Sequence, residues 1–248
     1  MADITSRRNP LIQKLRRLAS DPTFRRSEKL FLADGPKLLA DALRSGITPG
    51  LVAITEGVNP PALPDGTLLV TLSPGVMDAV SPSETPQGLL FTVPLPDPPK
   101  PVPPERGKWL LLDRIQDPGN VGSILRTAEA FALDGALLTD GCADPFSPKA
   151  VRASMGAVFR LPIATAPVDL LLSGTLTLVA AGFGDDAVPV GSVRYTDCVV
   201  ALGNEGRGLR PDIRERAETV VTIPMKGRAE SLGVAAAAAI LCWFLGKG

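Results

Sequence analysis

The chain contains no histidine among its 248 residues. This absence excludes every mechanism that needs an imidazole as base, nucleophile or metal ligand. Cysteine is sparse, and the three copies, Cys142, Cys198 and Cys242, lie far apart among apolar residues. Such an odd, scattered set argues against a disulfide framework and against a zinc site. We therefore expect no metal centre.

Long apolar runs are also missing. No stretch reaches the roughly 18 consecutive apolar residues that suggest a membrane helix, so we expect no membrane association. The N-terminus lacks the apolar core and small-residue cleavage site of a signal peptide, and a cytoplasmic location is expected. Aromatic residues make up 4% of the chain and apolar residues 45%. The interior must therefore be packed mainly with aliphatic side chains.

The formal net charge is zero, but the charge is unevenly distributed. Eight basic residues and three acidic ones give residues 1–30 a net charge of +5. Clustered arginine and lysine favour contact with phosphates. A solvated helix face is the alternative explanation of such a charge run. The arginines that we select as candidate RNA contacts are Arg7, Arg8, Arg16 and Arg17.

A proline-rich segment at 94–108 divides the chain. It contains seven prolines, each of which fixes φ and lacks a backbone donor, so neither a helix nor a central strand is expected there. An extended, semi-rigid linker is predicted. We expect one domain at 1–93 and another at 109–248.

Apolar spacing predicts a small α/β domain before the linker. Its expected helices are Asn9–Ala19 and Gly35–Arg44, and its expected strands are Leu51–Thr55, Leu68–Leu72 and Leu89–Val93.

After the linker, strands and helices alternate, which predicts a mostly parallel sheet covered on both faces. The expected strands are Trp109–Leu112, Gly135–Thr139, Leu161–Thr165, Leu176–Ala181, Cys198–Leu202 and Val220–Ile223. The expected helices are Val121–Phe131, Lys149–Val158 and Glu230–Leu245.

The first motif of chemical interest covers residues 110–138, where a strand runs through a polar loop into a helix. Ligands of open α/β sheets bind beyond the carboxyl ends of the strands, and Asn120 and Arg126 are expected near that edge. A helix cap would equally explain Asn120. A surface salt bridge would explain Arg126.

The second motif, at 199–213, runs from a buried strand into Gly203, Asn204, Glu205 and Gly206. Glycines let backbone approach a ligand closely. The spacing G-x-x-G-x-G differs from the dinucleotide fingerprint G-x-G-x-x-G, and no Walker motif occurs. A nucleotide-dependent oxidoreductase is therefore disfavoured, while a tight turn would explain the glycines as well as a ligand does.

The third motif, at 220–245, places Pro224 and Gly227 in a loop after a strand, followed by an alanine-rich helix. The helix is apolar all round, which predicts burial between surfaces. It fits either a core helix or a core helix that also forms a dimer interface.

Together the three motifs resemble the SpoU, or TrmH-like, branch of the SPOUT RNA methyltransferases. Asn120–Ala128, Leu202–Leu209 and Ile223–Val234 are similar to its N-x-G-x-x-x-R-T-A, L-G-x-E-x-x-G-L and I-P-M-x-G-x-x-x-S-L-N-V signatures. The N-terminal segments resemble the family's ribosomal-protein-L30-like substrate-binding domain. The resemblance covers essentially the whole chain. It implies a trefoil-knotted C-terminal domain, S-adenosylmethionine as cofactor, a homodimer, and methyl transfer to a ribose 2′-hydroxyl of RNA.

The resemblance also assigns site residues. The implied catalytic residues are Asn120, Arg126, Glu205 and Ser231, and Arg126 would also contact RNA. The implied cofactor-binding residues are Ala181, Leu202, Gly203, Asn204, Gly206, Ile223, Met225, Ser231 and Leu232.

One position departs from the family pattern, because Gly233 stands where the family has asparagine. The missing amide motivates an alternative, an RNA-binding protein with a decayed active site. Ribosomal RNA is the expected substrate because of the N-terminal domain, with transfer RNA as the other candidate. The sequence does not identify the target nucleotide.

Overall fold

The structure is a computed structural model that describes residues 3–100, 102–204 and 206–247. It divides into two compact units. The first comprises Met1–Asp97 and Asp144–Phe159, and the second comprises Pro98–Ala143 and Arg160–Gly248.

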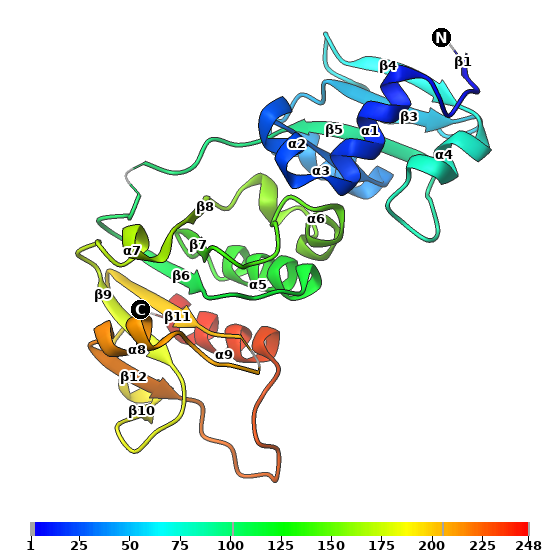
Figure 1. Cartoon of the computed structure of the whole chain (residues 1–248). Coiled ribbons are helices and arrows are strands. Elements are labelled where there is room, and N and C mark those ends of the chain that lie inside the picture. Colours follow the sequence, from blue (N-terminus) through cyan, green and yellow to red (C-terminus); the bar gives the residue numbers. More distant parts are fainter. Residues whose placement is uncertain (1–2, 101, 205, 248) are drawn as a thin grey trace. The chain divides into compact units, whose positions relative to one another are not determined.

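The first unit contains a mixed sheet with helices on it (Figure 1). In the described residues its strand order is β1-β4-β3-β5-β2; β2 and β3 each pair antiparallel with β5, and the other pairs are parallel. The strands are β1 (Asp3–Ile4), β2 (Leu30–Asp34), β3 (Leu51–Thr55), β4 (Leu68–Leu72) and β5 (Leu89–Pro94). The helices are α1 (Pro10–Ser20), α2 (Pro22–Glu28), α3 (Pro36–Arg44) and α4 (Pro74–Val80).

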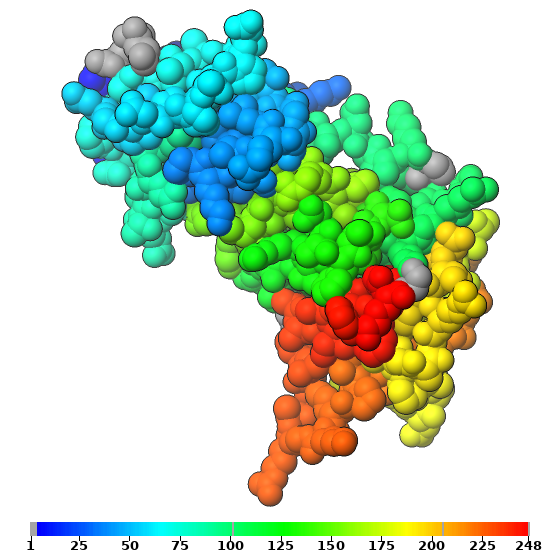
Figure 2. Space-filling view, turned by 180° about the vertical axis from the view of Figure 1, so that it is seen from behind, coloured from blue at the N-terminus to red at the C-terminus, as the bar shows by residue number. Residues whose placement is uncertain are grey.

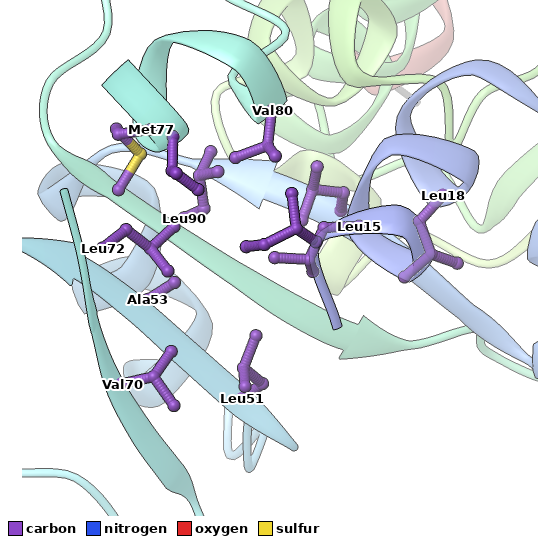
Figure 3. Close-up of a cluster of buried hydrophobic side chains, with 12 residues drawn as sticks. Leu15, Leu18, Leu51, Ala53, Val70, Leu72, Met77, Val80 and Leu90 are labelled. Carbon is purple, nitrogen blue, oxygen red and sulfur yellow. The ribbon is translucent and has the colours of Figure 1, made fainter. Parts of the chain in front are cut away.

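Aliphatic side chains from α1, α4 and the central strands form one core of this unit (Figure 3). Leu15 and Leu18 of α1 face the sheet at helical spacing and are fully buried, as are Met77 of α4 and Leu90 of β5. Burial of such side chains contributes about 1.5–3 kcal/mol each. This aliphatic packing follows the low aromatic content.

Residues 144–159, which connect two strands of the second unit, pack within the first one. They form α6 (Pro148–Ser154) and a 3-10 turn at Ala157–Phe159. The guanidinium of Arg25, 3% exposed, donates to Asp144 Oδ2 at 2.9 and 2.6 Å and to the Leu18 carbonyl at 2.6 Å. The Phe31 ring lies 5.2 Å from that of Phe146. This segment therefore packs with residues 1–97. The division of the chain into two domains at the segment 94–108 stays a prediction.

The second unit contains a seven-stranded parallel sheet with the order β10-β12-β9-β11-β6-β7-β8 in the described residues (Figure 1). Its strands are β6 (Lys108–Leu112), β7 (Gly135–Thr139), β8 (Ile163–Ala166), β9 (Thr177–Ala181), β10 (Val188–Pro189), β11 (Cys198–Leu202) and β12 (Thr219–Thr222). Its helices are α5 (Pro118–Ala130), α7 (Val168–Leu171), α8 (Pro211–Arg216) and α9 (Val234–Gly246), with a 3-10 turn at Val190–Ser192.

The strand order reverses beside β6. The chain steps outward from β6 to β7 and β8, then returns to β9 and inserts β11 between β9 and β6. Such a switch point opens a crevice beyond the carboxyl ends of the strands. The α/β class and the parallel sheet are confirmed, and the trefoil knot stays a prediction.

Three expected helices differ from the observed ones by more than one residue at an end. The helix expected from Val121 begins at Pro118. The helix expected at 149–158 ends at Ser154, because Met155 and Gly156 adopt left-handed φ values of 50° and 90°. The helix expected from Glu230 begins only at Val234, with Gly233 as its N-cap. Residues 230–233 are therefore part of the loop that follows β12, which projects from the unit in Figure 2.

The ion pair between Arg25 and Asp144 yields a stability prediction. Asp144→Ala leaves a buried guanidinium without its counter-charge, and we expect a loss of about 3 kcal/mol of unfolding free energy in urea denaturation. Arg44→Ala removes the exposed partner of Asp41 and serves as the control, with an expected change within about 0.5 kcal/mol. Equal effects of the two variants would contradict the prediction.

Candidate functional site

A pocket of about 410 Å³ lies at the carboxyl ends of three neighbouring strands, β9, β11 and β12. Its walls come mainly from the loops that follow these strands, and the first turn of α9 adds Val234 and Ala237. The lining residues are Ala181, Gly182, Phe183, Leu202, Gly203, Asn204, Gly208, Leu209, Arg214, Val221, Thr222, Ile223, Met225, Ser231, Leu232, Val234 and Ala237. This size and largely apolar lining are typical of a site for a small organic ligand.

Most of the residues expected to bind the cofactor meet in this pocket. They are Ala181, Leu202, Gly203, Asn204, Ile223, Met225, Ser231 and Leu232. Gly206 is exposed and is not among the lining residues. Glu205 lies outside the described residues.

The glycine loop after β11 folds back on itself. A Cβ on Gly203 would overlap the carbonyl carbon of Gly208 and the amide of Leu209, so only glycine fits there. The Asn204 side chain makes two hydrogen bonds to backbone. Its Nδ2 donates to the Arg114 carbonyl at 3.1 Å, and its Oδ1 accepts from the Gly206 amide at 2.9 Å. A Cβ on Gly206 would meet only Asn204 Oδ1, at 3.6 Å. The tight-turn explanation therefore accounts for Gly203, and no steric contact with the described residues requires glycine at 206.

The fully buried carboxylate of Asp113, directly after β6, ties the loops of this edge together. It accepts from the Arg210 backbone amide at 2.9 Å, from Arg210 Nε at 2.8 Å and from the Thr139 hydroxyl at 3.0 Å. Its own amide donates to the Leu202 carbonyl at 2.8 Å. The ends of β6, β7 and β11 are thereby fixed relative to one another.

Arg210 is the matching cation of Asp113. Burial acts to lower the pKa of Arg210, but its bonds to Asp113 and Asp140 outweigh burial and raise that pKa above its usual value. The guanidinium is therefore permanently charged at this edge. A buried ion pair with several hydrogen bonds fixes geometry, because leaving either group unpaired would be costly.

Asn120 and Arg126 lie on α5, outside the set of pocket-lining residues. The helix cap is Asp117, whose Oδ1 accepts from the Asn120 amide at 3.0 Å. The capping explanation of Asn120 is thus wrong, since Asn120 sits inside the first turn. Arg126 is exposed.

The candidate RNA-binding arginines are exposed in the first unit. Arg7 donates to the Gly75 carbonyl at 3.2 and 3.0 Å, and the Arg17 guanidinium lies 3.8 Å from the centre of the Phe24 ring. Arg8 and Arg16 are exposed beside them. Arg25, counted in the same charge run, is buried and bound to Asp144.

Sequence reasoning missed Asp113, Arg210, Arg214 and Phe183. The first could have been found, because it is a carboxylate placed directly after an apolar strand at the ligand-binding edge. Arg210 lies within the motif at 199–213, where attention went to the glycines, and Arg214 and Phe183 lie outside all three motifs.

The three cysteines are free thiols. Burial raises the pKa of Cys198 to about 11 and that of Cys242 to about 12, so both stay protonated near neutral pH. Within the described residues, no cluster of His, Cys, Asp or Glu has the make-up of a metal site, and no helix is long and apolar enough to cross a membrane.

Comparison with protein families gives two matches. Residues 108–243 match the SpoU rRNA Methylase family, and residues 9–90 match the MRM3-like substrate binding domain.

Individual relatives extend over the whole chain. The chain is 32% identical to the 23S rRNA (guanosine(2553)-2′-O)-methyltransferase RlmP of Bacillus subtilis, with 99% of each protein covered. The crystal structure of an AdoMet-bound rRNA methyltransferase from Sinorhizobium meliloti aligns with a TM-score of 0.85 at 28% identity, covering 99% of this chain and 97% of the other. The SpoU methyltransferase AviRb from Streptomyces viridochromogenes, in complex with AdoMet, aligns with a TM-score of 0.83 at 26% identity, over 97% and 98% of the two chains.

The glycine loop generates a paired prediction. Gly203→Ala forces a methyl group into the backbone of Gly208 and Leu209, and overpacking of this kind costs about 1–3 kcal/mol. Gly206→Ala has room for its methyl group and should change the unfolding free energy by no more than about 0.5 kcal/mol. Urea denaturation of both variants checks this, and the prediction fails if the alanine at 206 is the more damaging one.

Proposed function

This chain belongs to the SpoU rRNA methylase family, and on that premise we propose how its residues carry out the family's reaction. The protein is an RNA 2′-O-ribose methyltransferase that uses S-adenosylmethionine and acts on ribosomal RNA. The observation that supports the site assignment is the pocket at the ends of β9, β11 and β12, which gathers most of the expected cofactor residues.

The pocket fits this cofactor. Its apolar side chains, such as Leu209 and Ile223, suit the adenine, and Gly203, which has no side chain, contributes backbone to the pocket wall. The cofactor supplies a methyl group on a sulfonium that is already activated, so no metal is needed. Leu202, Gly203, Ile223 and Met225 would hold the adenine, and Ser231 and Leu232 would close the pocket from the loop before α9.

Arg126 acts on the acceptor side of the reaction. Its exposure on α5 leaves it open to an arriving RNA. An arginine guanidinium stays protonated in proteins and so cannot serve as an ordinary base. It binds a phosphate and stabilises the negative charge that develops on the ribose oxygen.

Asn120, Ser231 and Glu205 orient the reacting groups in this proposal. Gly233 does not prevent that role for its neighbours, because its φ of −58° and ψ of 145° are open to any residue and no atom lies within 4 Å of its Cβ direction. A side chain at position 233 would therefore begin in open space. This argues against a decayed site.

The RNA is bound by the first unit, through the exposed Arg8 and Arg16 and their neighbours Arg7 and Arg17. The match of residues 9–90 to a substrate binding domain supports this. The name of the Bacillus subtilis relative supports ribosomal over transfer RNA and suggests 23S RNA as the first substrate to test. The cytoplasmic location stays a prediction.

The test of the activity is tritium transfer from labelled S-adenosylmethionine to RNA. Purified protein should label ribosomal RNA from a strain that lacks it, and the label should appear in alkali-stable dinucleotides, which 2′-O-methylation produces. Label in transfer RNA alone would show that transfer RNA, and not ribosomal RNA, is the substrate. If the protein binds RNA but transfers no methyl group to any RNA, the alternative of an RNA-binding protein with a decayed active site is supported.

The role of Arg126 predicts a separation of effects. Arg126→Ala should cut methyl transfer at least a hundredfold, because charge stabilisation made mainly in the transition state is lost. Its affinity for S-adenosylmethionine, measured by calorimetry, should change less than about twofold, since Arg126 does not line the pocket. Transfer at the wild-type rate would remove Arg126 from the mechanism.

A homodimer through α9 is the second part of the proposal. Val234, Ala238, Leu241 and Leu245 bury one face of the helix, as expected for a core helix. The opposite stripe, Ala236, Ile240 and Trp243, repeats at helical spacing and is exposed or half-buried, with Trp243 49% exposed. The end of this helix (red) forms part of the surface in Figure 2. An apolar stripe of this kind is typical of an interface.

Light scattering at micromolar concentration should therefore give twice the chain mass. Ala236→Glu places a charge on the stripe without filling core space and should shift the protein to the monomer. Leu170→Glu changes another exposed apolar residue of the same unit and should leave the dimer intact. A monomeric wild type, or equal dissociation by both variants, would contradict the assignment of the interface to α9.

A further inference from the structure

Arg214 of α8 is the charged side chain of the pocket wall. Among the described residues that line the pocket, the others are apolar, glycine, or the neutral polar Asn204, Thr222 and Ser231. Arg214 is not part of any of the three motifs. The three motifs therefore do not account for a charged side chain at this position.

The two terminal nitrogens of this guanidinium have different surroundings. Nη2 donates to Asp186 Oδ1 at 2.7 Å, in the loop after β9. Nη1 is buried and has no hydrogen-bond partner among the described residues. It lies beside Gly182, where the position of an ideal Cβ is 3.4 Å from it. Both residues line the pocket, and Gly182 has no side chain that could supply an acceptor to Nη1.

A buried donor without an acceptor is costly, and such groups are rare in folded proteins unless a ligand or water completes them. The ion pair with Asp186 fixes the direction of the guanidinium and offsets its charge. Nη1 can thus donate a hydrogen bond without strongly repelling a cationic ligand. This matters for S-adenosylmethionine, whose sulfonium and ammonium are both positive.

We propose that Arg214 is a cofactor-binding residue whose Nη1 donates to an acceptor of S-adenosylmethionine. The inference rests on the proposed function for the identity of the ligand. The acceptor is either the carboxylate, which is the cofactor's anion, or an oxygen or nitrogen of the nucleoside. Asp186 is the positioning residue that holds the guanidinium in place.

The test measures binding by calorimetry rather than turnover. S-adenosylhomocysteine is the first probe and 5′-methylthioadenosine, which lacks the amino-acid part, is the second. Arg214→Met keeps the length and apolar stem of the side chain but removes the donor. We expect it to weaken binding of S-adenosylhomocysteine about tenfold or more, as for a lost hydrogen bond of a charged donor.

Asp186→Asn is the matched control. It weakens the same ion pair from the other side and leaves Nη1 in place, so binding should weaken less than about threefold. A loss for Arg214→Met seen with S-adenosylhomocysteine alone assigns the acceptor to the carboxylate. A loss of equal size with 5′-methylthioadenosine assigns it to the nucleoside. Both outcomes support the proposal.

Two outcomes overturn it. Unchanged affinity of Arg214→Met for both probes would show that Nη1 makes no contact with the ligand. Equal losses in Arg214→Met and Asp186→Asn would show that the pair only holds the loop after β9. Failure of the wild-type protein to bind either probe would instead contradict the proposed function, so the two failures are distinguishable.

Discussion

A single buried carboxylate, that of Asp113, holds the site in place. It lies at the end of β6, next to the switch point of the sheet, and takes donors from Thr139 after β7 and from Arg210 beyond the glycine loop. A charge without contact with water must have these partners, so the loops that supply them cannot move independently. Asp113 also binds the backbone at Leu202 and at Arg210, on either side of the segment that carries Gly203 and Asn204. The pocket at this edge of the sheet is thus supported by a residue that is not among its lining residues.

The sequence predicted most strands of the described residues but not β1, β2 and β10, and it predicted none of the short helices α2, α4, α7 and α8. Buried strands such as Cys198–Leu202 are short apolar runs between turn residues, and their bounds follow directly. Helices of seven residues or fewer are too short to show a clear apolar period, and an initial proline is shared by missed and predicted helices alike, since its missing N–H costs nothing at the first helical position. Tertiary packing was beyond reach of the sequence. Arg25 was counted with the exposed basic residues, but its partner Asp144 lies 119 positions away.

The part of the site that could be predicted is the part that the backbone forms at the ends of the strands. Motif residues such as Leu202, Gly203 and Ile223 meet in one pocket because parallel strands end at the same edge of the sheet. The presence of a glycine in the sequence did not show whether the chain's own backbone requires it. Gly203 is required by the chain's own backbone, whereas Gly206 has free space around it. Arg214 could not be selected from sequence, since its significance depends on an ion pair to another loop and on a nitrogen left without a partner.

The proposed mechanism places the methyl donor and the acceptor RNA in two different environments. In the proposed mechanism the methyl donor is held by backbone, aliphatic side chains and the guanidinium of Arg214 in the pocket beyond β9, β11 and β12. Arg126, the proposed catalytic arginine, lies on α5, exposed and outside the set of pocket-lining residues. With no histidine in the chain, no imidazole is available to remove the proton of the ribose hydroxyl. Charge stabilisation by Arg126 then depends on an RNA that brings its own phosphate and oxygen to the helix. The proposed reaction therefore requires bound RNA, because Arg126 can stabilise charge only on an acceptor that has reached it.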